Sequence, residues 1–275
     1  MKSLTFFSFF AFLFAVPAQG SIMVDFLIPS GFTGGDRLNL TSEIVLDFSI
    51  DGTGMVTLDA SNAGAAGSSS TVADSQAAVN SWDGVVGTVI ESSLFNTDFT
   101  LTMNGFRRDD AMTTFNPVNI SGDGAIDGTT NGVLGIFGQN ASRIDGSNLT
   151  NVNLERIAFT LSTTTSNLVL DFESFSHFGG GGSDAQVIQN TTTVDFFNIG
   201  DGTADLSASS FELQNGESII FTMPESGNAG FGLDAITFSA VPEPSTIILL
   251  SLGALLVGGC RLRAWRTREK QVVSP

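Results

Sequence analysis

The sequence predicts an all-β fold, a β-sandwich of jelly-roll-like topology, on three observations. Short runs of partly alternating apolar and polar residues are rich in Thr, Phe, Ile and Val. Gly, Asn, Asp or Ser stands on both sides of these runs. The central chain shows no sustained apolar period of 3.6 residues and no β–α–β alternation, so sheets packed face to face are favoured over helical or α/β folds.

Seven runs have the composition and length of strands, and their spacing in the second half suits a jelly roll. A single domain over residues 21–241 is favoured over a division near Ser121. In chain order, the expected strands are Glu43–Ile50, Asp98–Met103, Leu154–Ser162, Asn167–Phe172, Thr193–Asn198, Glu217–Met223 and Leu233–Ala240.

Glycine marks the expected connections, because it adopts positive φ without steric cost. The run Gly179–Gly182 predicts a flexible hairpin tip, the Ala/Gly/Ser-rich segment Ala60–Thr71 predicts a loop, and Ser75–Trp82 is the best short-helix candidate. Turns are expected at Asp51-Gly52, Asn104-Gly105, Asp145-Gly146 and Asn215-Gly216.

The aromatic residues are nearly all phenylalanine: the chain has 24 Phe, 2 Trp and no Tyr. Phenylalanine buries a large apolar surface and offers no hydroxyl group to a ligand. Most of these rings are therefore expected in the core rather than on a binding surface.

The N-terminus has the layout of a secretory signal peptide over residues 1–20. Lys2 is a minimal positive region, Leu4–Val16 is apolar, and Ala18-Gln19-Gly20 offers the small residues that a signal peptidase reads. Cleavage is expected after Gly20, with Ala18 as the alternative.

The C-terminus, residues 242–275, carries three short segments in a fixed order. Residues 242–245 read Pro-Glu-Pro-Ser, residues 246–260 are uncharged and apolar, and residues 261–275 are basic. The two prolines favour an extended, accessible peptide around Glu243. The apolar segment is expected to be a membrane helix, and the basic residues keep its end cytoplasmic: Arg261, Arg263, Arg266 and Arg268.

This order resembles the PEP-CTERM sorting signal of Gram-negative bacteria, and the resemblance covers about the last tenth of the chain. The matching motif is Val241, Pro242, Glu243, Pro244 and Ser245. The resemblance implies recognition by the membrane protease exosortase, an inner-membrane-tethered precursor, and a mature protein at the cell surface or in the extracellular matrix. It also implies association with exopolysaccharide and biofilm. An ordinary C-terminal membrane anchor is the alternative.

The body also resembles the jelly-roll ectodomains common among PEP-CTERM proteins. Asn131–Asp145 leads into a strand that begins with Glu155, and the closing strand runs directly into the sorting motif. This second resemblance implies a fold and no known activity.

The body is strongly acidic. Residues 21–241 hold 26 of the 28 Asp and Glu residues and five arginines, a formal net charge of −21, with no lysine. Nucleic acid is thus excluded as a partner, since its binding depends on cations that neutralise phosphate. The only cysteine, Cys260, lies in the apolar segment, which rules out an intramolecular disulfide and a Cys-rich zinc site.

No catalytic residues are predicted. His177 is the only histidine and is interpreted as a strand-end residue, and the pair Asp171 and Glu173 is interpreted as part of a solvated strand face. No cofactor is expected. A structural calcium ion is a hypothesis, because Gly-flanked aspartates four residues apart suit oxygen ligation: Asp123 with Asp127, and Asp201 with Asp205.

These observations predict a non-catalytic, exported surface or matrix protein that is processed by exosortase and has exopolysaccharide or neighbouring cells as its partner. Two alternatives stay open. A carbohydrate-binding module would need exposed aromatic rings on one sheet face, and a polysaccharide-acting hydrolase would need two converging carboxylates in a cleft.

Overall fold

The computed structural model describes residues 21–26, 37–51, 56–61, 83–86, 97–109, 114–123, 133–136, 144, 154–165, 168–178, 182–225 and 229–241. They belong to one compact unit, Gln19–Val241. The expected signal peptide, the short helix Ser75–Trp82 and residues 242–275 lie outside the described residues. Within the described ranges there are strands and no helix, so none there has the length and apolar character of a membrane-crossing helix.

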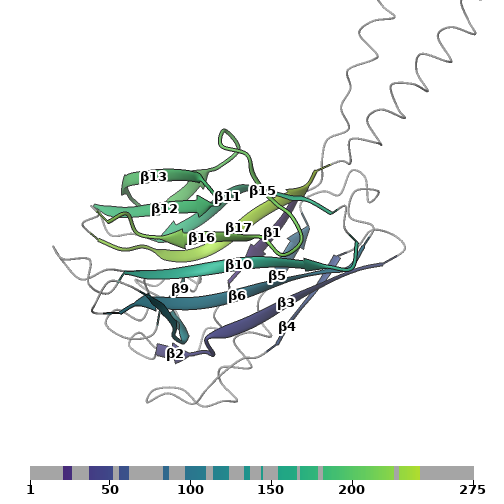
Figure 1. Cartoon of the computed structure of the whole chain (residues 1–275), viewed down its shortest axis with the longest axis horizontal. Helices are drawn as coiled ribbons and strands as arrows, with labels where there is room; N and C mark the ends of the chain where they lie inside the picture. The colour runs from purple at the N-terminus through teal and green to yellow at the C-terminus, as the bar shows by residue number, and fades with distance from the viewer. Residues whose placement is uncertain are drawn as a thin grey trace, which may run out of the picture. The chain divides into compact units, whose positions relative to one another are not determined.

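The described strands form two antiparallel sheets, which confirms the all-β prediction (Figure 1). Sheet A holds β1 (Ser21–Asp25), β2 (Arg37–Asn39), β5 (Asp83–Val86), β8 (Ile120–Asp123), β9 (Val133–Ile136), β11 (Leu170–Phe178), β14 (Gly202–Asp205), β15 (Phe211–Leu213) and β17 (Gly232–Ala240). Sheet B holds β3 (Glu43–Ile50), β4 (Val56–Ser61), β6 (Phe99–Arg108), β7 (Phe115–Pro117), β10 (Glu155–Thr163), β12 (Ser183–Gln189), β13 (Thr192–Ile199) and β16 (Ser218–Thr222).

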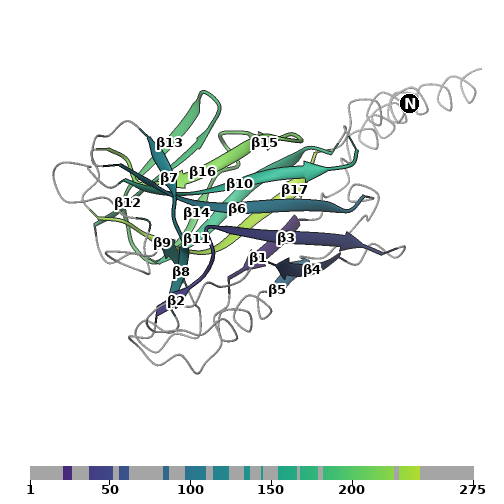
Figure 2. The ribbon, with the colours of Figure 1, turned by 60° about the horizontal axis from the view of Figure 1, so that its bottom comes forward.

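The chain passes repeatedly between the sheets, which gives the jelly-roll-like character. From β10 onward, β10, β12, β13 and β16 lie in sheet B, whereas β11, β14, β15 and β17 lie in sheet A. In Figure 2, β3, β6 and β10 can be followed as neighbours across sheet B. Since β11 and β12 lie in different sheets, the hairpin tip predicted at Gly179–Gly182 is wrong: the segment joins two layers.

Alternation of side chains explains how the two layers bury one core. Strand β3 alternates strictly from Ile44 to Phe48, with Ile44, Leu46 and Phe48 buried and the residues between them turned outward. Phe48 meets Phe238 of sheet A edge-on, with ring centroids 5.8 Å apart. Phe175 and Phe221 make a similar contact at 5.4 Å. Burial of each such side chain contributes about 1.5–3 kcal/mol.

The prediction that phenylalanine fills the core is confirmed for the described residues. Nine phenylalanines have less than 2 % of their surface exposed, whereas Phe197 is exposed. The fully buried rings are Phe26, Phe48, Phe159, Phe172, Phe175, Phe211, Phe221, Phe231 and Phe238.

All seven predicted strands are present, six of them with shifted ends and Glu43–Ile50 with the predicted ends. The largest shift concerns the strand expected at Asn167–Phe172, which runs from Leu170 to Phe178 as β11. Of the predicted turns, Asn215-Gly216 is confirmed, with Gly216 at φ 83°. Gly52 and the pair Asp145-Gly146 lie outside the described residues.

The turn predicted at Asn104-Gly105 is wrong, because both residues lie inside β6. On one edge, β6 pairs with β3 up to Asn104 and with β7 from Phe106 onward. Gly105 stands at this change of partner: its N–H donates to Ser42 O, and its carbonyl accepts from the Val118 N–H, both at 3.0 Å. A Cβ at this position would lie 2.6 Å from Val118 O. Glycine is therefore needed for close approach and not for a turn.

Candidate functional site

The sorting motif begins where the last strand of the sandwich ends. Strand β17 pairs with β11 on one edge, and with β1 and β9 on the other. Val241 follows it and donates its N–H to Val169 O at 2.8 Å. Pro242, Glu243, Pro244 and Ser245, and the arginines at 261, 263, 266 and 268, lie outside the described residues. An interior strand of sheet A thus ends directly before Val241, the first residue of the predicted motif.

The aspartates considered for calcium are only partly described. Asp205 ends β14 and is fully exposed, and its carboxylate accepts hydrogen bonds from the Ser207 N–H at 2.9 Å and the Ser207 hydroxyl at 2.6 Å. These bonds lower the pKa of Asp205. Asp201 precedes β14, Asp123 ends β8, and Asp127 lies outside the described residues. No cluster of three or more metal-ligating side chains occurs in the described part of the chain, and calcium stays a prediction.

His177 lies near the end of β11 and is buried to 7 % exposure beside Phe175, with ring centroids 5.5 Å apart. Burial lowers the pKa of His177, and Asp201 and the backbone of Gly200 oppose that change. No serine hydroxyl is bonded to its ring in the described residues. The imidazole thus packs beside the Phe175 ring, with Asp201 and the Gly200 backbone acting on it from the segment before β14.

Acidic and hydroxyl side chains meet on the outer face of sheet A. In β11, Asp171 lies opposite Glu212 of β15 on one side and Ser239 of β17 on the other. Burial raises the pKa of Asp171, and the charges of Glu212 and Glu173 raise it further. One oxygen of Asp171 is buried without a hydrogen-bond partner. Asp171 is therefore partly buried, unlike the solvated strand face that the sequence predicted.

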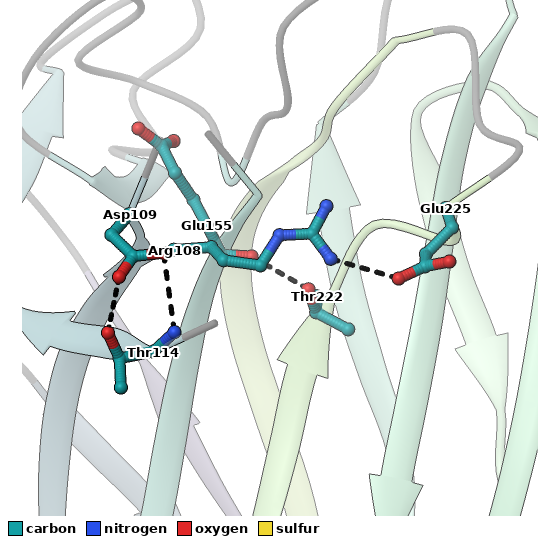
Figure 3. Close-up of polar contacts among 6 residues, drawn as sticks. All are labelled: Arg108, Asp109, Thr114, Glu155, Thr222 and Glu225. Carbon is teal, nitrogen blue, oxygen red and sulfur yellow. Dashed lines mark hydrogen bonds and ion pairs between the residues drawn. The ribbon is translucent and has the colours of Figure 1, made fainter. Parts of the chain in front are cut away.

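Three of the five body arginines gather at one end of sheet B, an arrangement that the sequence analysis did not predict. Arg107, in β6, forms an ion pair with Glu155 of β10, with Nη2 to Oε1 at 2.6 Å and Nε to the same oxygen at 3.0 Å. Arg108 pairs with Glu225 at 2.9 Å (Figure 3). Glu155 also accepts, through its backbone carbonyl, a 2.7 Å hydrogen bond from the Thr222 hydroxyl.

Arg156 is the third arginine, and aromatic rings hold it. It lies on the outer face of sheet B, because side chains alternate along a strand and Ile157, Phe159 and Leu161 point into the core. Its Cζ atom lies 3.6 Å from the Phe115 ring centroid and 5.1 Å from the Phe106 ring centroid, both within the range of cation–π attraction. Burial lowers the pKa of Arg156, although a guanidinium stays protonated in proteins.

Sequence reasoning missed this cluster because its members are far apart in the chain. The sequence analysis assigned no role to Arg107 and Arg108, and it expected most phenylalanines in the core. One signal was present, a predicted strand in which Arg156 directly follows Glu155. That signal does not reveal the β6–β10 register that places Arg107 opposite Glu155 and Phe106 opposite Arg156.

Comparison with protein families identifies the C-terminal segment. The family model described as "PEP-CTERM protein-sorting motif" matches residues 240–266. The chain carries a PEP-CTERM protein-sorting motif. The match confirms the resemblance drawn from Pro242–Ser245 and the segments after it, and it supports an exported protein that an exosortase processes. It covers the end of the chain and leaves the activity of the β-sandwich open.

The body has only weak similarity to known proteins. No curated protein matches the chain. Among solved structures, a Podospora anserina GH26-CBM35 β-(1,4)-mannanase matches 52 % of this chain and 28 % of its own, with 22 % identity and a TM-score of 0.31. A ruminal GH26 endo-β-1,4-mannanase matches 40 % of this chain and 21 % of its own, with 16 % identity and a TM-score of 0.25. The chain thus spans less than a third of either structure.

Proposed function

We propose that this chain is a non-catalytic surface or matrix protein that is exported, cut by exosortase at its PEP-CTERM motif, and retained with exopolysaccharide. The observation that carries the proposal is the junction at Val241. The last described strand ends at Ala240, and the matched motif covers residues 240–266. A cut within or after Pro242–Ser245 would therefore leave every described strand in place.

The position of β17 suits a protein that is held by its C-terminus. Eight of the nine residues of β17 pair with β11, and β1 pairs with the same strand from the other edge. A pull on Val241 would load the hydrogen bonds of both edges together rather than unzip an edge strand. The proposed mature protein is thus anchored through the interior of a sheet.

The sorting part of the proposal is tested by mass spectrometry of the protein in the native envelope. The wild-type protein is expected to lack the residues after the motif, and Glu243→Ala is expected to leave a full-length, membrane-held form. Glu269→Ala removes the same type of side chain outside the motif and is expected to be processed normally. Peptides that span Ser245 into the tail, found as the major wild-type species, would contradict the proposal.

The matrix part is tested by fractionation of cells that make exopolysaccharide. The processed protein is expected in the polysaccharide fraction, and it is expected to leave that fraction when the polysaccharide is digested or its synthesis is deleted. Equal recovery in the free medium with and without polysaccharide would reject this partner.

One observation favours a second candidate function, hydrolysis of a polysaccharide. Asp171 and Glu212 face each other on neighbouring strands, and the pKa of Asp171 is raised by burial and by Glu212. A carboxylate pair with one raised pKa is the arrangement that glycosidases use. Release of reducing sugar by the wild-type protein and its loss in Asp171→Asn and Glu212→Gln would establish this alternative.

A further inference from the structure

Arg156 differs from the two arginines beside it. Arg107 and Arg108 each pair with a glutamate, whereas no ion pair of Arg156 occurs in the part of the chain that the structure describes. The body carries 26 acidic residues, so a cation that packs on phenylalanine rings in place of a carboxylate is unusual for its surroundings. Its charge is held in position by aromatic rings and is paired with no carboxylate of the described residues.

The way Arg156 is held leaves the guanidinium edge for a ligand. The Phe115 ring covers the group at 3.6 Å, and Nε is buried without a hydrogen-bond partner. The two terminal nitrogens are neither buried nor bonded to a described residue. A guanidinium with its rotation restricted by a stacked ring can donate two parallel hydrogen bonds in its plane, and this geometry matches a carboxylate.

The strands beside Arg156 place further side chains in its row. Phe106 lies opposite Arg156 on β6, and the buried Thr222 lies opposite it on β16. Gln186, on β12, lies opposite Thr222 and is partly exposed. The Gln186 amide nitrogen donates to Asp195 at 2.6 Å, which orients its carbonyl oxygen. An amide held in this way can accept a hydrogen bond from a sugar hydroxyl.

The next row of the same face is apolar. Ala158, Ile220 and Ile188 lie opposite one another on β10, β16 and β12, two residues along from the Arg156 row. Ile188 and Ile220 are partly exposed. A flat strip of aliphatic carbon beside a cation and an oriented amide suits a ring that has a C–H face and a carboxylate edge.

The charge of the body limits how acidic the ligand can be. With a formal net charge of −21, the protein repels densely charged polyanions at long range, and a single arginine cannot offset that repulsion. The occupant therefore carries isolated carboxylates between neutral units.

We propose that Arg156, supported by Phe106, Phe115 and Gln186, binds the carboxylate of a uronic acid unit in a glycan of low charge density. The proposal rests on the proposed function, because it gives the chemical class of the exopolysaccharide partner. It places that partner on the outer face of sheet B, at the end where β6, β7 and β10 meet.

The test measures equilibrium binding of the processed protein, purified from the envelope, to a fluorescent oligosaccharide of alternating glucuronate and neutral sugars. The same oligosaccharide with its carboxyl groups reduced to alcohols is the matched ligand. We expect Arg156→Gln to weaken binding of the glucuronate form by roughly tenfold or more, equivalent to about 1.4 kcal/mol. Arg156→Lys is expected to recover only part of the loss, because an ammonium lacks the planar fork.

A second variant controls for net charge. Thr57→Glu lowers the charge by one unit, as Arg156→Gln does, at an exposed position of β4 on the same sheet, and it is expected to bind like the wild type. Melting curves verify that each variant is folded. Equal binding of both ligand forms, or equal binding by the wild type and Arg156→Gln, would overturn the proposal.

The outcomes separate this inference from the proposed function. Retention with native exopolysaccharide that does not depend on Arg156 would reject the site and leave the matrix role standing. Absence of the wild-type protein from the polysaccharide fraction would reject the matrix role, and glucuronate binding that is sensitive to Arg156 would then stand as a separate activity.

Discussion

Replacement of Gly105 by alanine tests how β6 changes partner beside the arginine cluster. The new Cβ would lie 2.6 Å from the backbone oxygen of Val118, 2.9 Å from Ile120 Cγ1 and 3.0 Å from Ile136 Cδ1. The first contact is with backbone that is itself hydrogen-bonded to Gly105, so a change of side-chain rotamer cannot relieve it. The chain at residue 118 must move, and the nearby strand β7 carries Phe115.

The magnitude follows from two opposing terms. Overpacking of a filled site costs about 1–3 kcal/mol, and the lower entropy of the unfolded alanine chain returns about 0.4–1 kcal/mol. A net loss of about 1–2 kcal/mol lowers the melting temperature of a domain of this size by about 2–8 °C. Gly200→Ala is the matched control, because nothing lies within 4 Å of its added Cβ.

The assay is thermal unfolding of the processed protein, followed by circular dichroism. Gly105→Ala is expected to melt below the wild type, and Gly200→Ala is expected to melt at the same temperature or slightly above it. Because movement at Val118 would shift Phe115 away from Arg156, Gly105→Ala is also expected to weaken glucuronate binding. A melting temperature for Gly105→Ala equal to or above that of the wild type would refute the close approach at β6.

Three further predictions concern charge and ions. Glu155→Gln is expected to destabilise the fold by about 2–3 kcal/mol, because the Glu155 side chain is 3 % exposed and its loss leaves Arg107 without its carboxylate. Glu225→Gln changes a side chain that is 75 % exposed and is expected to cost less than about 1 kcal/mol. Equal losses of stability for the two variants in urea unfolding would contradict this contrast. Folding raises the pKa of Asp171, so the stability of the wild type falls as pH rises through the folded-state value. Asp171→Asn is expected to melt above the wild type at pH 7, by a margin that shrinks as the pH falls toward the unfolded-state pKa of about 4. A margin that does not depend on pH would be the contrary result. Calcium is expected to raise the melting temperature more than magnesium does at equal ionic strength if an aspartate site exists, and identical curves would remove that hypothesis.

Much of this protein is encoded locally and is readable in the sequence. Strand β3 was predicted with its observed ends, because a half-buried strand repeats every two residues and that pattern needs no knowledge of the partner strand. The sorting motif is readable for the same reason: an enzyme recognises it as a short extended peptide, so its residue order is its function. The burial of phenylalanine follows from the ring having no polar group to satisfy.

Tertiary structure decided whatever depends on which strands lie side by side. Asn104-Gly105 has the composition of a turn, and only the approach of Val118 explains why glycine stands within β6. The run Gly179–Gly182 connects the two sheets, because β11 pairs with strands of sheet A and β12 pairs with strands of sheet B. Arg156 is a polar residue of an ordinary strand until the register brings Phe106 beside it and β7 brings Phe115 over it. Pairings across tens of residues depend on the packing of the whole core, and local sequence carries no direct record of them.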